Sequence, residues 1–338
     1  MKRVSFEKMK SEITRVLIKK GFEEEKAEES AELFSKASLD GVYSHGLNRV
    51  LRLVEYIDKG WINVQGEPIL INSTTFIERY NGNLGPGDLN AKFCMDRAMK
   101  LAENNMLGMV TINNTSHWMR GGNYGWQAAE SGYIGMCWTN TESCMPPWGA
   151  KEQKIGNNPI ILAVPNKRNP IVLDMAMSQF SYGKLQVTRL KDEELPIDGG
   201  FNEHGQLTRN PGEIENSRRI LPMGYWKGSG LSFLLDLIVA LLSQGNSTAD
   251  LDKIKPGKRT SGYGVSQVFI AVDPYKLSGD EFTQQVVVNA LDHFKKAEVD
   301  ENMKEVTYPG ENTLKRRKEN FKKGIPVDID IWEKVLSL

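Results

Sequence analysis

The first side chains in this sequence that could take part in catalysis are a histidine and an arginine that follows it by four residues. His45 lies in Tyr-Ser-His-Gly at residues 43–46, and Arg49 follows. Residues four apart share one face of a helix, so a helix beginning by His45 would place the two side chains together. A guanidinium grips a carboxylate through two hydrogen bonds, and an imidazolium donates a proton to a neighbouring carbonyl oxygen. The pair therefore suits an α-keto acid; a helix-capping Ser44-His45 pair with a solvated Arg49 is the structural alternative.

A second histidine lies in a polar stretch that follows a strand-like run. His117 belongs to residues 113–123, directly after the apolar residues 109–112, and Arg120 is three residues further on. Strand ends are where α/β sheets place ligands, so we expect His117 and Arg120 to line a polar pocket. A buried histidine bonded to a backbone carbonyl is an equally good reading of His117. Further polar candidates for such a pocket are Asn48, Ser116, Asn123 and Asn140.

Two other segments could serve a ligand. Asp174 ends an apolar run, where it could orient a histidine, hold a ribose or cap the next helix. Residues 226–230, Trp-Lys-Gly-Ser-Gly, lead into a hydrophobic helix. Such a turn offers free N–H groups to an anion, with Lys227 beside them, which is a weak signal for a phosphate site.

The common cofactor and metal motifs are missing from the sequence. No G-x-G-x-x-G follows a strand, and no Walker A sequence, H-E-x-x-H or C-x-x-C occurs. The three cysteines are too few for a disulfide framework, and an odd number of them cannot all pair. We also expect no metal site.

The hydrophobic periodicity divides the chain into three parts. Residues 1–70 predict a helical subdomain, residues 71–299 an α/β domain, and residues 300–338 a separate C-terminal segment. Residues 191–219 have no period and predict a long loop, and a polar link at 166–169 joins two strands. The basic quartet at 315–318 is interpreted as the solvated face of a helix.

Composition excludes several classes of protein. The chain has 338 residues with 43 Lys+Arg and 43 Asp+Glu, and this balance argues against a nucleic-acid partner. No signal peptide is recognisable, and the longest apolar run, residues 231–242, is too short to span a bilayer. We therefore expect a cytoplasmic protein without a membrane partner.

Several blocks of the sequence resemble the malate/L-lactate dehydrogenase family 2. These blocks are residues 43–46, 114–122, 137–140, 145–152, 174–178 and 219–230. The resemblance extends over nearly the whole chain. It implies a non-Rossmann fold of the L-sulfolactate dehydrogenase type, in which a mixed-sheet cofactor domain accompanies a helical domain built from both chain ends. Such a fold would explain why no G-x-G-x-x-G motif follows a strand in this sequence.

The resemblance also implies an activity, a cofactor and a partner. His45 would be the proton donor, Arg49 would bind the substrate carboxylate, and NADH or NADPH would be the cofactor. The implied cofactor contacts are Pro170, Ile171, Val172, Leu173, Asp174, Met175, Ala176, Trp226, Lys227, Gly310, Glu311 and Asn312. The expected reaction reduces the C2 carbonyl of a sugar acid, 2,3-diketo-L-gulonate, to 3-dehydro-L-gulonate in a homodimer. Another 2-oxo acid (malate, lactate, ureidoglycolate or a cyclic imine carboxylate) and an inactive binding protein of the same fold remain open.

Overall fold

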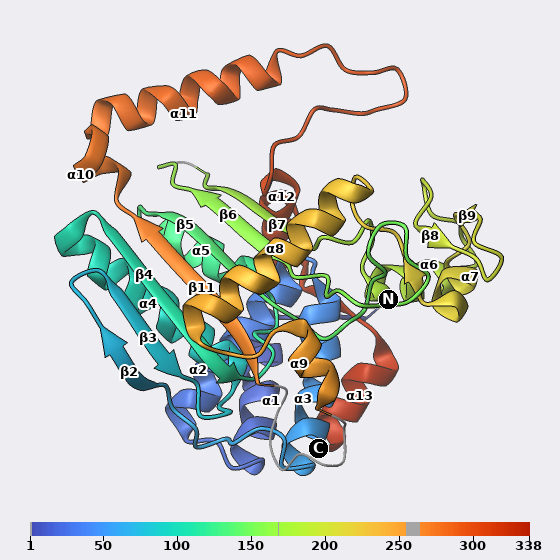
Figure 1. Ribbon diagram of the computed structural model, residues 1–338, viewed down its shortest axis with the longest axis horizontal. Helices are drawn as coiled ribbons and strands as arrows, with labels where there is room; N and C mark the ends of the chain where they lie inside the picture. The colour runs from blue at the N-terminus through green and yellow to red at the C-terminus, as the bar shows by residue number, and fades with distance from the viewer. Residues whose placement is uncertain (1, 168, 255–263) are drawn as a thin grey trace.

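A seven-stranded sheet forms the centre of the molecule (Figure 1). The computed structural model describes residues 2–167, 169–254 and 264–338, so Arg168 of the predicted link lies outside the described residues. In spatial order the strands are β2 (Ile69–Ser73), β3 (Ile77–Asn81), β4 (Leu107–Thr115), β11 (Val265–Val272), β5 (Ile134–Thr139), β6 (Ile160–Val164) and β7 (Ile171–Met175). β3 and β4 run parallel and the other neighbours antiparallel, which confirms the predicted mixed sheet.

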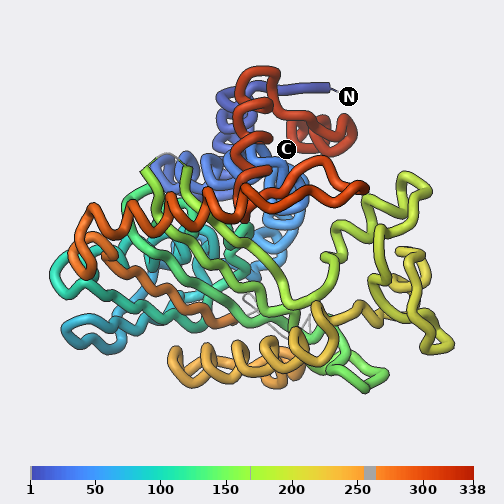
Figure 2. The backbone as a smooth tube through the Cα atoms, turned by 90° about the horizontal axis from the view of Figure 1, so that it is seen from above, coloured from blue at the N-terminus to red at the C-terminus, as the bar shows by residue number. Residues whose placement is uncertain are grey.

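Helices cover both faces of this sheet because its central strand alternates its side chains. Phe269 and Ala271 of β11 join a core with α4 (Gly87–Asn105) and α5 (Gly122–Glu130). Val268 and Ile270 point to the opposite face, where they pack with α8 (Trp226–Ser243). Figure 2 shows α8, in gold, on one side of the sheet and the blue N-terminal helices on the other. The two-residue period of a strand thus produces three layers.

The two ends of the chain meet in one helical unit. Its elements are β1 (Lys2–Val4), α1 (Phe6–Lys19), α2 (Glu24–Leu39), α3 (Leu47–Asp58), α12 (Glu311–Lys323), β12 (Ile325–Val327) and α13 (Ile329–Ser337). β1 pairs with β12, and Trp332 and Val335 of α13 share a core with Ile13 of α1 and Val50 of α3. We propose, from this common core, that residues 1–70 and 300–338 fold as one domain beside 71–299.

A buried carboxylate ties this helical unit to the sheet domain. Asp40 is 4% exposed and accepts hydrogen bonds from Arg120 Nη1 at 2.5 Å and from Arg317 Nε at 2.6 Å. The Arg317 guanidinium also lies 4.4 Å from the centroid of the Trp126 ring. Arg317, a member of the basic quartet that we expected to be solvated, therefore belongs to the domain junction. Opposite charge across the junction explains the difference, because spacing along one helix gives no information about a partner on another element.

The predicted long loop at 191–219 is wrong, because this segment folds into a small lobe. It contains β8 (Gly200–Phe201), β9 (Leu207–Thr208), α7 (Pro211–Ser217) and β10 (Arg219–Ile220), and α6 (Tyr182–Leu190) precedes it. The elements pair in the order β10-β8-β9 and enclose Leu195 and Ile214. Strands of two residues are too short to produce a hydrophobic period, so the sequence carries no signal for them.

The remaining helices are α9 (Thr248–Lys253), α10 (Pro274–Ser278) and α11 (Asp280–Lys295). By length and composition alone, α8 could cross a membrane, since it extends over 18 residues with a mean hydropathy of 1.4. It is longer than the apolar run singled out in the sequence, and a core helix of a soluble protein would pass the same test. Leu235 and Val239 of α8 lie buried against the sheet.

Candidate active site

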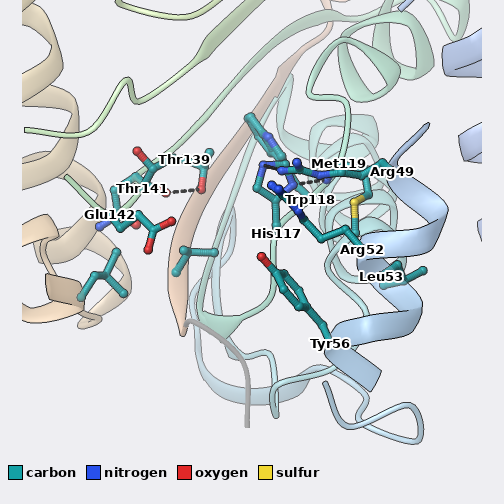
Figure 3. A pocket seen from close by; sticks show the side chains of 13 residues that line it. Arg49, Arg52, Leu53, Tyr56, His117, Trp118, Met119, Thr139, Thr141 and Glu142 are labelled. Carbon is teal, nitrogen blue, oxygen red and sulfur yellow. Dashed lines mark hydrogen bonds between the residues drawn. The ribbon is translucent and has the colours of Figure 1, made fainter. Parts of the chain in front are cut away.

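A pocket opens between α3 and the ends of β4 and β5 (Figure 3). From α3 it is lined by Arg49, Arg52, Leu53 and Tyr56. Residues 117–119 after β4, residues 139–142 at the end of β5, Leu251 and Val265 complete the wall. Arg52 and Tyr56 follow Arg49 by three and seven residues, which is the spacing of one helix face. The helical unit and the sheet therefore each supply one wall.

His117 and Arg49 converge in this pocket as two hydrogen-bond donors. His117 Nδ1 accepts a hydrogen bond from the backbone N–H of Met119 at 2.9 Å. A neutral imidazole with an accepting Nδ1 carries its proton on Nε2. This Nε2 lies 3.4 Å from Nη2 of Arg49. Burial and then the charge of Arg49 hold the pKa of His117 well below its usual range, so the ring is neutral and the pair presents two N–H groups to an acceptor.

His45 stands beside this pair. It lies on a short 3-10 turn, Tyr43–His45, just before α3, and its ring stacks near that of His117 with the centroids 6.1 Å apart. Ser44 Oγ engages Nδ1 at 2.9 Å, which leaves Nε2 as the nitrogen that can exchange a proton with a ligand. The turn is separate from α3, which begins at Leu47, so the condition of a helix that starts by His45 is not met, but the charge of Arg49 still acts on the imidazole.

Burial and neighbouring cations depress the basicity of His45. Its pKa falls to about 4, first because of burial and then because of the Arg49 charge, while Asp174 raises it and Arg120 lowers it further. At neutral pH the imidazole is therefore uncharged and able to accept a proton. An anion bound at Arg49 would cancel the principal cationic contribution and raise this pKa.

The Asp174 carboxylate binds the N-terminal end of α5. Its Oδ2 accepts a hydrogen bond from the backbone N–H of Gly122 at 3.1 Å and lies 3.5 Å from Arg120 Nε. Of the three readings of Asp174, helix capping agrees with this geometry, although the helix is α5 and not the next one along the chain. A side chain on Gly122 would overlap Asp174, since an added Cβ would approach Oδ2 closely.

The three segments expected to contact the cofactor converge on β7, the edge strand. Val172 donates its backbone N–H to the carbonyl of Pro309 at 3.1 Å, and this places Gly310, at the start of α12, beside the strand. Gly310 has φ +91°, and a Cβ there would lie 3.1 Å from the Val172 nitrogen. At the end of β7, Met223 donates its N–H to Met177 O at 2.8 Å, which brings the start of α8 close.

An unsatisfied hydroxyl lies at the same end of β7. Ser178 is 7% exposed, and its Oγ has no hydrogen-bond partner among the described residues. A buried polar atom without a partner costs free energy, and a bound polar group would remove that cost. The start of α12 lies near one end of β7, and the start of α8 and Ser178 lie near the other end. A polar ligand that contacts all three segments would be extended, as a nicotinamide dinucleotide is.

Comparison with known proteins identifies the family. The family model described as malate/L-lactate dehydrogenase matches residues 4–336. The chain belongs to this family. A relative from Klebsiella pneumoniae (strain 342), named 2,3-diketo-L-gulonate reductase, is 47% identical over 338 residues, covering 99% of this chain and 100% of the relative. A relative of the same name from Salmonella typhimurium is 46% identical over 337 residues, with coverages of 99% and 100%.

Solved structures of two dehydrogenases have the same fold. Sulfolactate dehydrogenase from Methanocaldococcus jannaschii superposes with a TM-score of 0.89 at 28% identity, covering 99% of this chain and 95% of that one. Malate dehydrogenase from Pyrococcus horikoshii OT3 gives 0.88 at 29% identity, with coverages of 98% and 93%. The predicted sulfolactate dehydrogenase-type fold is confirmed.

Of the further polar candidates, Asn140 lines the pocket as expected, and Asn140, Ser116 and Asn123 all make hydrogen bonds within the fold. Ser116 Oγ accepts from the Gly87 N–H and donates to the Gly85 carbonyl, and Asn140 Nδ2 donates to Asp236. Asn123 Nδ2 donates to the Leu33 carbonyl. Residue type alone cannot separate such framework groups from ligand contacts.

Arg120 is also placed away from the pocket wall. It is 3% exposed, and its guanidinium pairs with Asp40 and lies near Asp174. This geometry makes Arg120 a positioning residue: it joins α2 to the strand that carries Asp174.

The start of α8 offers fewer donors than we expected for an anion site. The backbone N–H groups of Lys227, Gly228 and Ser229 donate to the carbonyls of Gly224, Met223 and Tyr225. The first turn is therefore already closed by its own preceding residues. The Lys227 side chain is then the cationic group that this segment can offer.

Arg52, Tyr56 and Glu142 are among the pocket residues that the sequence analysis did not single out. Arg52 and Tyr56 follow Arg49 at helical spacing, so the periodicity of α3 could have found them. Glu142 comes directly after β5 and carries no such signal, because it meets α3 only through the folded sheet.

Proposed function

We propose that the protein reduces 2,3-diketo-L-gulonate at its C2 carbonyl, using NADH or NADPH, and forms 3-dehydro-L-gulonate. The observation that carries the proposal is the convergence of Arg49 and His117 Nε2 as two donors beside the His45 imidazole. A 2-oxo acid offers a carboxylate for the two donors and a neighbouring carbonyl for the imidazole. The names of the relatives support the choice of sugar acid.

Each residue has a distinct task in this proposal. Arg49 and His117 hold the substrate carboxylate, which fixes the C2 carbonyl relative to His45. The reduced nicotinamide, when bound along β7 and the starts of α8 and α12, supplies the hydride. His45 donates a proton to the oxygen at C2, where negative charge develops during the reduction. Because the pKa of His45 is about 4 without ligand, binding of the carboxylate must raise it for this donation.

The cofactor contacts proposed are the twelve residues of the three converging segments. Residues 170–176 include all of β7, Trp226 and Lys227 begin α8, and Gly310, Glu311 and Asn312 begin α12. Support comes from the Val172–Pro309 hydrogen bond and the buried Ser178 hydroxyl near the start of α8.

We further propose a cytoplasmic homodimer that binds neither nucleic acid nor a membrane. The equal numbers of acidic and basic residues support the absence of a polyanionic partner. Two helices supply apolar surface for a second copy, since α8 exposes Phe233 (53%) and Leu241 (79%), and α11 exposes Phe282 (64%). In Figure 1, α11 extends clear of the sheet. Light scattering of the purified protein should give twice the chain mass of 38.0 kDa.

A panel of 2-oxo acids tests the reaction. The absorbance of NADH, and separately of NADPH, is followed with 2,3-diketo-L-gulonate, pyruvate, oxaloacetate and piperideine-2-carboxylate. The proposal predicts the highest kcat/KM for the diketo sugar acid. A higher value for another member would reassign the substrate. Absence of turnover with every member, together with no rise in melting temperature on adding NADH, would indicate an inactive binding protein.

A further inference from the structure

The pocket extends from the His117–Arg49 pair toward a charged end that the reduction chemistry does not use. Figure 3 shows Glu142 and Thr141 on one side of this end, and Arg52 and Tyr56 on the other. The Glu142 carboxylate and the Tyr56 hydroxyl are both directed into the space between the walls. A substrate tail that extends along the pocket away from Arg49 and His117 would reach this end.

The charges of this end leave no excess of cations that could hold a second substrate carboxylate. Arg49 and Arg52 contribute two cations, and Glu142 contributes one carboxylate. Asp252 adds another negative charge behind Glu142, where Ser143 fixes it through its N–H at 2.9 Å and its hydroxyl at 2.6 Å. Burial and then Asp252 raise the pKa of Glu142, while Arg52 and Arg49 lower it, so these groups interact in one electrostatic cluster.

Hydroxyl groups and a second carboxylate would meet Glu142 very differently. A hydroxyl donates a hydrogen bond to a carboxylate oxygen, and a charge-assisted bond of this kind is stronger than one between neutral groups. A second carboxylate at the same place would face Glu142 with Asp252 behind it, and like charges brought together weaken binding. An enzyme discriminates strongly between two substrates when one of them leaves a polar group of the site unpaired or facing a like charge.

We propose that Glu142 is a specificity-determining residue that selects monocarboxylates with a hydroxyl-bearing tail and rejects dicarboxylates. Tyr56 lies opposite and supplies a second polar contact to the tail. The inference rests on the proposed function, which fixes the position of the substrate carboxylate. It adds the residue that would contact the part of the substrate beyond the C2 carbonyl.

The test compares a monocarboxylate and a dicarboxylate in wild type, Glu142→Gln and the control Glu152→Gln. Glu142→Gln keeps the size of the side chain and removes the charge. Glu152 is an exposed glutamate of the same chain region, with 79% of its side chain accessible, and it does not line the pocket. Calorimetry measures the Kd of L-gulonate and of L-malate for each NADH-loaded protein, and steady-state assays measure kcat/KM for 2,3-diketo-L-gulonate and oxaloacetate.

We expect Glu142→Gln to shift the ratio of the two Kd values about tenfold toward malate, with a parallel shift in kcat/KM. Glu152→Gln should leave both ratios within about twofold of wild type. An unchanged Kd ratio in a folded Glu142→Gln protein that still binds NADH would overturn the inference. Wild type that reduces neither substrate would overturn the proposed function, whereas the Kd ratio would still decide the role of Glu142.

Discussion

His117 Nε2 and Arg49 Nη2 face each other at 3.4 Å with a proton on each. The backbone N–H of Met119 fixes this arrangement, because it occupies Nδ1 of the imidazole. An acceptor bound between these two nitrogens would receive a hydrogen bond from each. The free pocket is thus prepared for an anion, and binding of that anion also changes the electrostatics at His45.

Removal of the His45 imidazole should abolish turnover while leaving cofactor binding largely intact. Loss of a general acid typically costs between 10² and 10⁴ in rate, so we expect kcat of His45→Ala to fall by at least about 10². The Kd of NADH, measured by fluorescence titration, should stay within about threefold of wild type, because the proposed cofactor contacts lie on β7, α8 and α12. Loss of NADH binding together with activity would point to misfolding.

The reduction should slow as the pH rises. The free protein must carry a proton on His45, whose pKa is about 4, so kcat/KM for reduction should fall about tenfold per pH unit between pH 5 and 8. Alcohol oxidation uses the neutral ring, so its kcat/KM should be level over this range. Arg49→Met should move the reductive decline to higher pH, since Arg49 lowers the pKa of His45. A reductive profile that is flat from pH 5 to 8 would contradict this role.

Mild acid should destabilise the fold through the two half-buried histidines, His45 and His117. Between the ordinary pKa of 6.5 and the folded value of about 4, the unfolded chain binds a proton at His45 and the native protein does not. The free energy of unfolding therefore falls as the pH drops through this window, by about 3 kcal/mol for His45. His117, whose pKa is also lowered, adds to the loss. Denaturation of His117→Asn should show a shallower dependence on pH; an equally steep one would contradict the assignment.

Arg120 should act on stability rather than on substrate affinity. Arg120→Met removes one of the two guanidinium partners of the buried Asp40 and should cost about 3 kcal/mol in the free energy of unfolding. Well below its melting temperature, the variant should retain the KM of wild type. Arg316→Met, which removes an exposed pair with Glu319 at 3.7 Å, is the matched control and should cost below about 1 kcal/mol. A raised KM without a loss of stability would restore Arg120 to the pocket.

Sequence periodicity predicted the elements that are long enough to repeat. The buried positions of α1, Met9, Ile13, Val16 and Leu17, are those that the sequence placed on one face. The small lobe after α6 was missed because its strands have two residues each, and β1 was missed because its pairing with β12 joins the two ends of the chain.

Local sequence patterns likewise predicted only those residues of the candidate site that lie close together in the chain or directly after a strand. His45 and Arg49 lie within five residues, so spacing alone brought them together, and His117 was found from its place after β4. Glu142 reaches the pocket only because β11 holds β4 and β5 in one sheet, a pairing between distant segments that no local pattern encodes. Asn140 has the residue type of a ligand contact and does line the pocket, although its side-chain amide donates a hydrogen bond to Asp236.

A crystal structure of the complex with NADH and a non-reducible 2-oxo acid analogue tests the central claim most directly. The measured quantity is the distance from His45 Nε2 to the ligand oxygen that corresponds to the C2 carbonyl. We predict a hydrogen bond of about 2.6–3.2 Å, with the ligand carboxylate accepting from Arg49 and from His117 Nε2. A C2 oxygen that instead contacts water or another acid, with the nicotinamide far from His45, would contradict the account.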